Sequence, residues 1–305
     1  MALIAGGKSS EREVSLKSGA QVYKALNKDR YDIRRYDPLT DLERLVREAR
    51  ELDAALIIMH GRGGEDGSMQ GLLDLLEIPY QGSGVLASAL AMNKELSKAV
   101  YQLAGLKVPA ALAFHREKAP SPREIEAKLG LPVVIKPVNE GSSIGISKAP
   151  TLEALKTGLT AAFALDNRVL VEEFIPGTEV TGGVLGNAKL QALPLVEIIP
   201  GSTYTFFDYE AKYQPGATEE ICPARLSPDM TKRAQECALI AHQALGCWGY
   251  SRTDMMIRQQ DIYVMETNTI PGMTATSLFP QGAKAAGLDF PDLLDTLITL
   301  ALEKV

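Results

Sequence analysis

The sequence predicts a mixed α/β and α+β protein with more than one domain, and three observations support this fold class. The chain has 305 residues, about the size of two or three domains of roughly 100 to 150 residues each. Strand and helix signals alternate over about the first ninety residues, which is typical of a parallel sheet covered by helices. After Pro176-Gly177 strands follow one another directly, which indicates an antiparallel sheet.

Apolar runs and glycines divide the N-terminal unit into its elements. The apolar run 2–5 ends at Gly6-Gly7, and apolar residues then recur at helical spacing as far as Leu26. We expect strands near 2–5, 31–36, 54–59 and 78–80, and helices over 16–26, 42–52 and 69–76. The unit should end near Met92, so residues 1–92 form the first predicted domain.

Two further units are predicted beyond this point. Residues 87–104 are mainly helical, and Ser121-Pro122-Arg123-Glu124 is a capping sequence that starts a helix ending at Gly130. The later expected elements are strands 133–137 and 169–174 around a Gly-rich loop 139–145 and a helix 152–163, strands 179–185 and 190–199, a long loop 201–219, a helix from 228 to Gly246, a hairpin around 259–261 and a helix from Pro291. The predicted domains are therefore 93–175 and 176–305.

The composition argues against several classes of function. Lys and Arg number 32 against 38 Asp and Glu, so the net charge of −6 lacks the basic surplus of a general nucleic-acid binder or of a protein that adheres to anionic membranes. Three cysteines without C-x-x-C spacing indicate neither a disulfide framework nor a zinc knuckle. The chain is predicted to be cytoplasmic because it lacks a signal-like start and an apolar run of about 18 residues. His115 and His242 are interpreted as structural.

The segment 250–277 contains the most informative pattern of polar residues. Two strand-like runs flank 259–261, which we interpret as a three-residue hairpin loop. With that loop, Asp254 faces Glu266 and Arg252 faces Asn268, and all four side chains project from one face because strand side chains alternate. Two carboxylates and an amide oxygen on one face suit Mg²⁺. A solvated polar face is the alternative for any one of these acids taken alone.

Three glycine-rich loops are further candidate sites. The loop 136–145 begins at Lys136 and suits a phosphate, although it has neither a Walker A ending nor a G-x-G-x-x-G fingerprint. The loop 60–67 begins at His60 and follows the strand 54–59, at the sheet edge where ligands bind. The loop 6–15 should share that edge and presents Glu11 and Glu13. Either glutamate could recognise an ammonium group or simply cap the next helix.

Six motifs together resemble the D-alanine-D-alanine ligases of the ATP-grasp superfamily, and the resemblance runs from Gly6 to Leu278. In chain order they are GGKSSEREVSLKSG, HGRGGEDGSMQG, GSGVLASALAMNK, KPVNEGSSIGISK, FDYEAKY and ETNTIPGMTATSL. No single motif would suffice, but their joint order is highly specific. The resemblance implies a three-domain ATP-grasp architecture, with an N-terminal α/β substrate domain and ATP held between the sheets of the other two domains.

The resemblance also implies ATP-driven ligation of two D-alanine molecules for peptidoglycan synthesis. The carboxylate of the first D-alanine would attack the γ-phosphate, and the amine of the second would attack the resulting acyl phosphate, releasing phosphate. The implied cofactors are ATP and two Mg²⁺ ions, which Mn²⁺ can replace. The implied partners are these small molecules and a second copy of the chain in a homodimer, without nucleic acid or membrane.

Each functional residue takes a role from this resemblance. The residues implied to bind ATP are Lys94, Lys136 and Lys212 at the phosphates, Glu172, Glu173 and Ile175 at the adenine edge, and Glu179 at the ribose. The implied metal ligands are Asp254, Glu266 and Asn268. The residues implied to bind the amino acids and to assist the reaction are Glu11 at the first ammonium, His60 at the first carboxylate, Ser142 and Tyr213 linked to Glu11, Arg252 and Gly272 at the oxyanion, and Ser277 at the second carboxylate.

Two alternatives remain beside this interpretation. The same scaffold could make a D-alanyl-D-lactate or D-alanyl-D-serine product, although Tyr213 within EAKY favours the dipeptide by family resemblance. A catalytically silent ATP-binding protein is the alternative of a different class. Such a protein has no need for Glu11, Ser142, Tyr213 and Arg252 together, so the sequence favours an enzyme.

Overall fold

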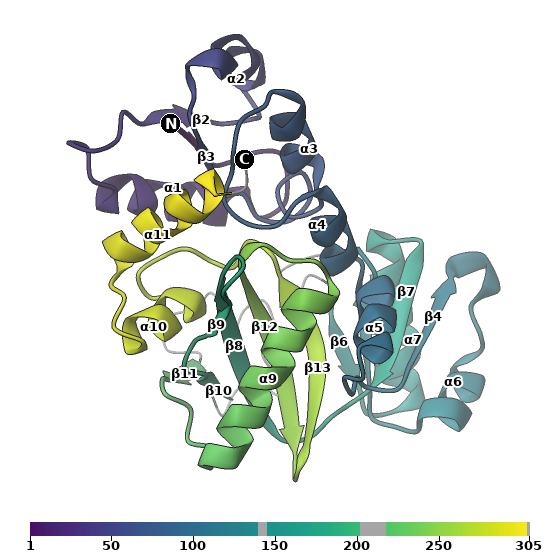
Figure 1. Cartoon of the computed structure of the whole chain (residues 1–305). Coiled ribbons are helices and arrows are strands. Elements are labelled where there is room, and N and C mark those ends of the chain that lie inside the picture. The colour runs from purple at the N-terminus through teal and green to yellow at the C-terminus, as the bar shows by residue number, and fades with distance from the viewer. Residues whose placement is uncertain (140–144, 202–217, 304–305) are drawn as a thin grey trace.

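A computed structural model describes residues 1–139, 145–201 and 218–303, and over these residues the chain forms three sheets with helices around them (Figure 1). The N-terminal sheet has the order β2-β1-β3, the middle one β4-β7-β5-β6, and the last one β11-β10-β8-β12-β13 with β9 beside β8. A parallel sheet followed by antiparallel ones is the mixed architecture that the sequence predicts. The exact domain boundaries remain predictions.

The N-terminal sheet is parallel, and two of its three strands, β1 and β3, are buried throughout. Its strands are β1 (Ala2–Ile4), β2 (Arg34–Tyr36) and β3 (Ala55–Ile57), and the expected strand at 78–80 is reduced to a bridge between Ala55 and Tyr80. The helices of this part are α1 (Arg12–Ala25), α2 (Leu42–Glu48), η1 (Ala49–Glu51) and α3 (Ser68–Leu75). The last helix of the chain, α11 (Phe290–Leu302), returns to this unit and packs with α1 and β3 (Figure 1).

The middle sheet is antiparallel and is preceded by two helices, α4 (Val85–Met92) and α5 (Lys94–Leu103). The break between them occurs at Asn93, whose side chain accepts a hydrogen bond from the Leu96 N–H. The strands are β4 (Ala111–His115), β5 (Val133–Pro137), β6 (Ser147–Ala149) and β7 (Arg168–Glu173), and the helices are η2 (Arg116–Lys118), α6 (Pro122–Leu129) and α7 (Leu152–Leu165). The predicted capping box at Ser121 and Glu124 is confirmed.

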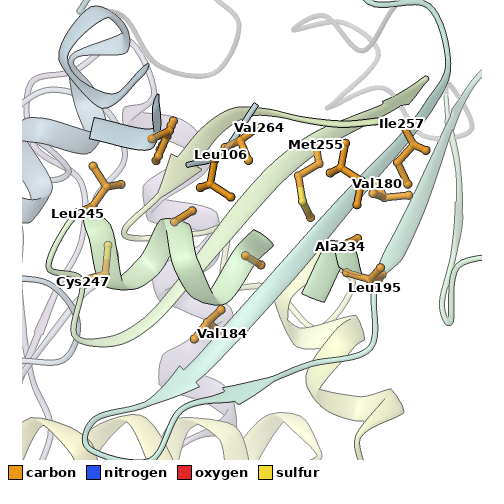
Figure 2. Close-up of a cluster of buried hydrophobic side chains, with 14 of the residues drawn as sticks. Leu106, Val180, Val184, Leu195, Ala234, Leu245, Cys247, Met255, Ile257 and Val264 are labelled. Carbon is orange, nitrogen blue, oxygen red and sulfur yellow. The ribbon is translucent and has the colours of Figure 1, made fainter. Parts of the chain in front are cut away.

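The third sheet is antiparallel throughout. Its strands are β8 (Thr178–Gly186), β9 (Gln191–Ala192), β10 (Val196–Pro200), β11 (Thr218–Ile221), β12 (Gly249–Arg258) and β13 (Asp261–Asn268), and its helices are α9 (Pro228–Ala244) and α10 (Leu278–Ala285). Helix α9 packs on one face, where its Ala234 belongs to the same buried apolar cluster as Val180, Met255 and Val264 of the sheet (Figure 2). The expected loop 201–219 lies outside the described residues except for its ends, and its C-terminal end already belongs to β11.

The hairpin β12–β13 has the predicted pairing at its polar residues but a different turn. Arg252 pairs with Asn268 and Asp254 with Glu266, as expected. The predicted three-residue loop is wrong, because Asp261 pairs with Arg258 and leaves a two-residue turn in which Gln259 has φ 57°. A bulge between Asp254 and Met255 shifts the register by one residue, and so restores the pairing at the site. Within the described ranges, no helix is long and apolar enough to cross a membrane.

Candidate active site

The polar residues of the hairpin meet one another as predicted. Arg252 donates from Nε and from its terminal nitrogen to the two carboxylate oxygens of Asp254, at 2.9 and 2.8 Å, and Asn268 Nδ2 lies 3.3 Å from Asp254 Oδ2. Burial alone would lower the pKa of the Arg252 guanidinium, but the charges of Asp254 and Glu266 raise it by more than burial lowers it, so the net shift is upward. The guanidinium is therefore a permanent positive charge on this face of the sheet.

Glu266 connects the hairpin to the middle unit. Its carboxylate lies 3.6 Å from the Nζ of Lys94, the first residue of α5. The described residues contain no group of three His, Cys, Asp or Glu side chains that could hold a metal ion. The predicted ligand set contains only two carboxylates, and its third member, Asn268, supplies an amide. These three residues lie on one face through the pairing described above.

A buried cluster of charges lies where α5, β5 and β7 meet. Glu172 has no exposed surface, and its carboxylate pairs with Lys98 Nζ at 2.7 Å and with Lys136. Burial alone would raise the pKa of the Glu172 carboxyl, but the two lysines together lower it by more than burial raises it. The net shift is downward, so the group stays ionised. Burial lowers the pKa of Lys98, whereas the pKa of Lys136 is raised on balance because nearby carboxylates outweigh its burial. Sequence reasoning missed Lys98, although its position four residues after Lys94 on one helix was a signal.

The other predicted ATP-binding residues lie near this cluster. Glu173 ends β7, where its Oε1 accepts from the Ala110 N–H at 3.0 Å and its Oε2 lies 3.6 Å from Arg258. Ile175 follows and is buried. Glu179 belongs to β8, and its charge raises the pKa of Lys136. The strand end 172–175 and the start of β8 therefore border the two buried lysines, while Lys212 lies outside the described residues.

Glu11 and His60 lie together at the edge of the N-terminal sheet. A Cβ built on Gly61, whose φ is 70°, would lie 2.4 Å from a carboxylate oxygen of Glu11, so the turn after His60 packs on that carboxylate. The Ser9 hydroxyl donates to the His60 carbonyl at 2.7 Å. His60 is 5% exposed, with its Nδ1 3.4 Å from Glu65 Oε1. Its buried Nε2 has no hydrogen-bond partner among the described residues, so it can accept a ligand.

Gly272 and Ser277 lie together at the start of α10. A Cβ on Gly272 would lie 3.1 Å from Ser277 Oγ. That hydroxyl contacts Thr274 Oγ1 at 2.7 Å and accepts from the Thr274 N–H at 3.1 Å. Ser277 occupies the N-cap of α10, yet its side chain makes no capping hydrogen bond within the described part of the chain. The first amide groups of α10 thus lack their usual side-chain acceptor among the described residues, which suits an anion.

Glu220 and Gln281 are polar residues near this helix that the sequence did not single out. The side chain of Gln281 donates from Nε2 to Glu220 Oε2 and, at 2.7 Å, to the Thr276 carbonyl. Burial raises the pKa of the Glu220 carboxyl, which the hydrogen bond from Gln281 and the charge of Arg252 partly offset. No sequence signal identified this pair, because Glu220 lies at the end of the expected loop and Gln281 on a helix without a motif.

The N-terminal sheet is tied to the hairpin by a fully buried contact. Gln81 exchanges two hydrogen bonds of 2.8 Å with the backbone of Ile57 on β3, and its Nε2 lies 3.3 Å from the Tyr250 hydroxyl on β12. A Cβ on Gly249 would lie 3.1 Å from the Gly82 nitrogen, so the two backbones approach closely there. The carboxyl end of β3, which carries His60, is thereby connected to the strand that carries Arg252.

Comparison with known proteins identifies the family. Residues 35–83 match the family model described as D-ala D-ala ligase N-terminus, and residues 100–299 match D-ala D-ala ligase C-terminus. The D-alanine--D-alanine ligase of Syntrophobacter fumaroxidans is 60% identical over 303 residues, covering 99% of this chain and 97% of the relative. The chain belongs to the D-alanine–D-alanine ligase family. The relative from Desulfotalea psychrophila is 54% identical and covers 100% of this chain and 95% of its own length.

Solved structures agree with membership of the D-alanine–D-alanine ligase family. A D-alanine--D-alanine ligase from Bacillus anthracis complexed with ATP has 33% identity and a TM-score of 0.87, over 99% of this chain and 97% of that one. The VanG D-Ala:D-Ser ligase from Enterococcus faecalis has 36% identity and a TM-score of 0.85, over 98% of both chains. The predicted ATP-grasp architecture and enzyme class are therefore confirmed. Ser142 and Tyr213, like Lys212, lie outside the described residues of this ligase.

Proposed function

We propose that the chain joins two D-alanine molecules into D-alanyl-D-alanine for peptidoglycan synthesis, converting ATP to ADP and phosphate. The observation that carries the proposal is the hairpin face, where Asp254 accepts hydrogen bonds from both Arg252 and Asn268 beside the Lys94–Glu266 pair. This arrangement concentrates both charge signs at one place, as phosphoryl transfer to a carboxylate requires. It occurs in a chain 60% identical to a D-alanine--D-alanine ligase over nearly its whole length.

The reaction follows from the weakness of a carboxylate as an electrophile. A carboxylate oxygen of the first D-alanine attacks the γ-phosphorus of ATP, the bond to the β-phosphate oxygen breaks, and ADP leaves. The neutral amine of the second D-alanine then attacks the acyl carbon of the acyl phosphate. Inorganic phosphate leaves with the carbon–oxygen electron pair, and the new amide nitrogen loses a proton. Arg252 and the Gly272 N–H would stabilise the oxyanion of this second step.

In this proposal, different residues bind the phosphates, the adenine and the ribose of ATP. Lys94 and Lys136, with Lys212, would bind the phosphates, the strand end with Glu172, Glu173 and Ile175 would meet the adenine, and Glu179 would bind the ribose. The carboxylate of Glu172 is engaged by two lysines. Its contribution at the adenine would therefore come from its backbone rather than from its side chain.

The donor set of the hairpin fits a hard divalent cation. Asp254 and Glu266 would supply carboxylate oxygens and Asn268 an amide oxygen, and the amide nitrogen of Asn268 lies 3.3 Å from Asp254 Oδ2. We propose that these three residues hold two Mg²⁺ ions, which Mn²⁺ can replace. When bound, the ions would offset the negative charge of the phosphates. Arg252, whose guanidinium pairs with the Asp254 carboxylate in this structure, would then direct its charge towards the reacting groups.

The two amino acids would bind next to each other, through separate groups of residues. Glu11 would pair with the ammonium of the first D-alanine, and His60, whose Nε2 is buried without a partner among the described residues, would bind its carboxylate. Ser277 would receive the carboxylate of the second D-alanine at the start of α10. Ser142 and Tyr213 are proposed to complete the connection to Glu11. We further propose that the chain works in the cytoplasm, where ATP is available, and that it forms a homodimer, as its family resemblance implies.

One observation favours a second candidate function. The VanG D-Ala:D-Ser ligase has 36% identity and a TM-score of 0.85 with this chain, which is as similar as the D-alanine--D-alanine ligase of B. anthracis. The fold therefore does not by itself decide the second substrate. A D-alanyl-D-serine product is the alternative that the test must exclude.

The test measures ADP release by the purified chain with ATP, Mg²⁺ and D-alanine, with D-serine or D-lactate added in parallel as competing second substrates. We expect ADP release with D-alanine alone and D-alanyl-D-alanine as the main product of each mixture. Release with D-serine or D-lactate but not with D-alanine alone would overturn the substrate assignment. ATP binding without ADP release under every condition would indicate the catalytically silent alternative.

A further inference from the structure

Strand β11 contacts the start of α10 through one polar bridge. The Nε2 of Gln281 donates both to Glu220 Oε2 and to the Thr276 carbonyl. A glutamine amide nitrogen has two hydrogens, so these two acceptors use its whole donor capacity. The orientation of the Gln281 side chain is therefore fixed by Glu220 on one side and by the backbone before Ser277 on the other.

The elements on either side of this bridge are packed firmly. Leu278 lies in an apolar cluster with Val196 and Ile198, and Cys222, the residue that follows β11, packs against that cluster. The backbone N–H of Gln281 donates to the Ser277 carbonyl at 3.0 Å, which closes the first turn of α10. Glu220 lies within β11, two residues before Cys222. The polar bridge thus continues an apolar contact between the strand and the helix.

The bridge ends next to the residues that would bind the second amino acid. Thr276 immediately precedes Ser277, whose hydroxyl is held by Thr274 at 2.7 Å and lies beside Gly272. The charge of Arg252 acts on the Glu220 carboxyl, which places Glu220 in the electrostatic field of the same site. A change in the direction of the Thr276 carbonyl would rotate the peptide that leads into the N-cap of α10.

We propose that Glu220 is a positioning residue that acts through Gln281 on the Thr276–Ser277 peptide and so sets the affinity for the second amino acid. This inference rests on the proposed function, in which Ser277 receives the carboxylate of that amino acid. Glu220 itself touches no substrate. Its oxygen holds the Gln281 amide, the amide holds the Thr276 carbonyl, and the carbonyl fixes the direction of the Ser277 hydroxyl and of the first amides of α10.

Four variants separate this role from a structural one. Glu220→Leu and Gln281→Leu break the bridge at either end, whereas Glu220→Gln removes the charge but keeps an oxygen that accepts from Gln281. Glu219→Leu is the matched control, because the neighbouring Glu219 is exposed and lies on the opposite face of β11. Thermal unfolding monitored by circular dichroism establishes that each variant is folded before its kinetics are compared.

The measurement is the initial rate over a wide range of D-alanine concentrations, fitted with separate KM values for the first and second molecules. Glu220→Leu and Gln281→Leu should each raise the second KM by about ten-fold, with the KM for ATP and for the first D-alanine unchanged. The double variant should be no worse than either single one, since both break the same bridge. Glu220→Gln and Glu219→Leu should behave like the unaltered chain.

Three results would overturn the inference. These are an unchanged second KM in both leucine variants, a loss spread equally over all three KM values, and a Glu220→Gln variant as impaired as Glu220→Leu. Failure of the proposed function would look different, because the unaltered chain would then make no dipeptide from D-alanine. In that case the same variants are compared with whichever second acid the unaltered chain accepts, since its carboxylate would use the same helix start.

Discussion

Glu172 illustrates what a fully buried carboxylate requires of its neighbours. An unpaired charge in the interior costs several kcal/mol, and here two lysines meet one glutamate, Lys98 at 2.7 Å and Lys136 on the other oxygen. Because two lysines share one glutamate, the cluster keeps a surplus positive charge, which in the proposed function would bind a phosphate. Sequence inspection identified Lys136 from its loop but not Lys98, because a lysine on a helix is ordinarily a solvated residue.

Replacing Lys98 should therefore affect both stability and nucleotide binding. Lys98→Met leaves Glu172 to be neutralised by Lys136 alone, so we expect a loss of about 3 kcal/mol in the free energy of unfolding and weaker ATP binding. Urea denaturation and calorimetric titration with ATP measure these two effects. The control is Lys107→Met, which breaks an exposed pair with Asp261 and should cost less than about 1 kcal/mol. Equal losses in the two variants would contradict the role of Lys98.

His242 makes the stability depend on pH in a definite direction. Burial lowers its pKa to about 4 from the ordinary value of 6.5, and its Nδ1 lies 2.7 Å from the Ser251 hydroxyl. Between these two pH values the unfolded chain takes up a proton that the folded chain resists. Stability should therefore fall as the pH drops from 6.5 to 4, by about 3 kcal/mol from this residue.

The measurement for His242 is the free energy of unfolding in urea at several pH values. Many carboxylates also titrate in this range, so the informative quantity is the difference between the unaltered chain and His242→Gln. That difference should shrink or reverse as the pH falls, because the variant has no imidazole to protonate. Parallel pH profiles would mean that His242 does not resist protonation in the folded chain.

Among the elements, the hairpin separates what a sequence can predict from what it cannot. Alternation of polar and apolar residues placed Arg252, Asp254, Glu266 and Asn268 on one face, and the pairing confirms this. The two-residue turn and the bulge were missed. The turn shifts the strand pairing by one residue and the bulge shifts it back, so the alternation of polar and apolar residues near the site is the same with or without them. Short strands such as β4 and β11 were also missed, since they have little apolar periodicity of their own.

The hairpin acids are tested best by a substitution that keeps their shape. Glu266→Gln removes one charged ligand and the partner of Lys94, so we expect the apparent Mg²⁺ affinity in the ligation assay to fall by about ten-fold or more, with the fold retained. Turnover is measured across a Mg²⁺ titration, and excess Mg²⁺ should restore part of it. Glu219→Gln, which removes an exposed charge, is the control. Unchanged turnover at limiting Mg²⁺ would contradict the metal role.

The loop after β3 allows a test of close approach between two elements. Gly61 and Gly105 both have positive φ values, 70° and 81°, but a Cβ on Gly61 would meet the Glu11 carboxylate whereas one on Gly105 would meet nothing within 4 Å. Both alanine variants should lose about 1 kcal/mol of stability from backbone strain. Only Gly61→Ala should also raise the KM for the first D-alanine. Equal KM values for the two variants would argue against Glu11 as the ammonium site.

At the scale of the whole molecule, contacts between distant segments assemble the site. Helix α11 packs on the N-terminal sheet although it ends the chain, and Gln81 links β3 to Tyr250 on β12. An amphipathic pattern identifies the face that a helix buries but not its partner, so α11 was predicted as a helix without a position. The order of the motifs, rather than composition or net charge, was what indicated a common cleft.

Coupling of ATP cleavage to formation of the dipeptide is the central feature of the proposed reaction. The decisive measurement is ADP and D-alanyl-D-alanine quantified in the same sample, with purified chain, ATP, Mg²⁺ and D-alanine. We expect equal amounts of the two products, and the loss of both in an Arg252→Met variant that still binds ATP. ADP release without dipeptide by the unaltered chain, or full dipeptide formation by that variant, would contradict the proposed reaction and the role of the hairpin.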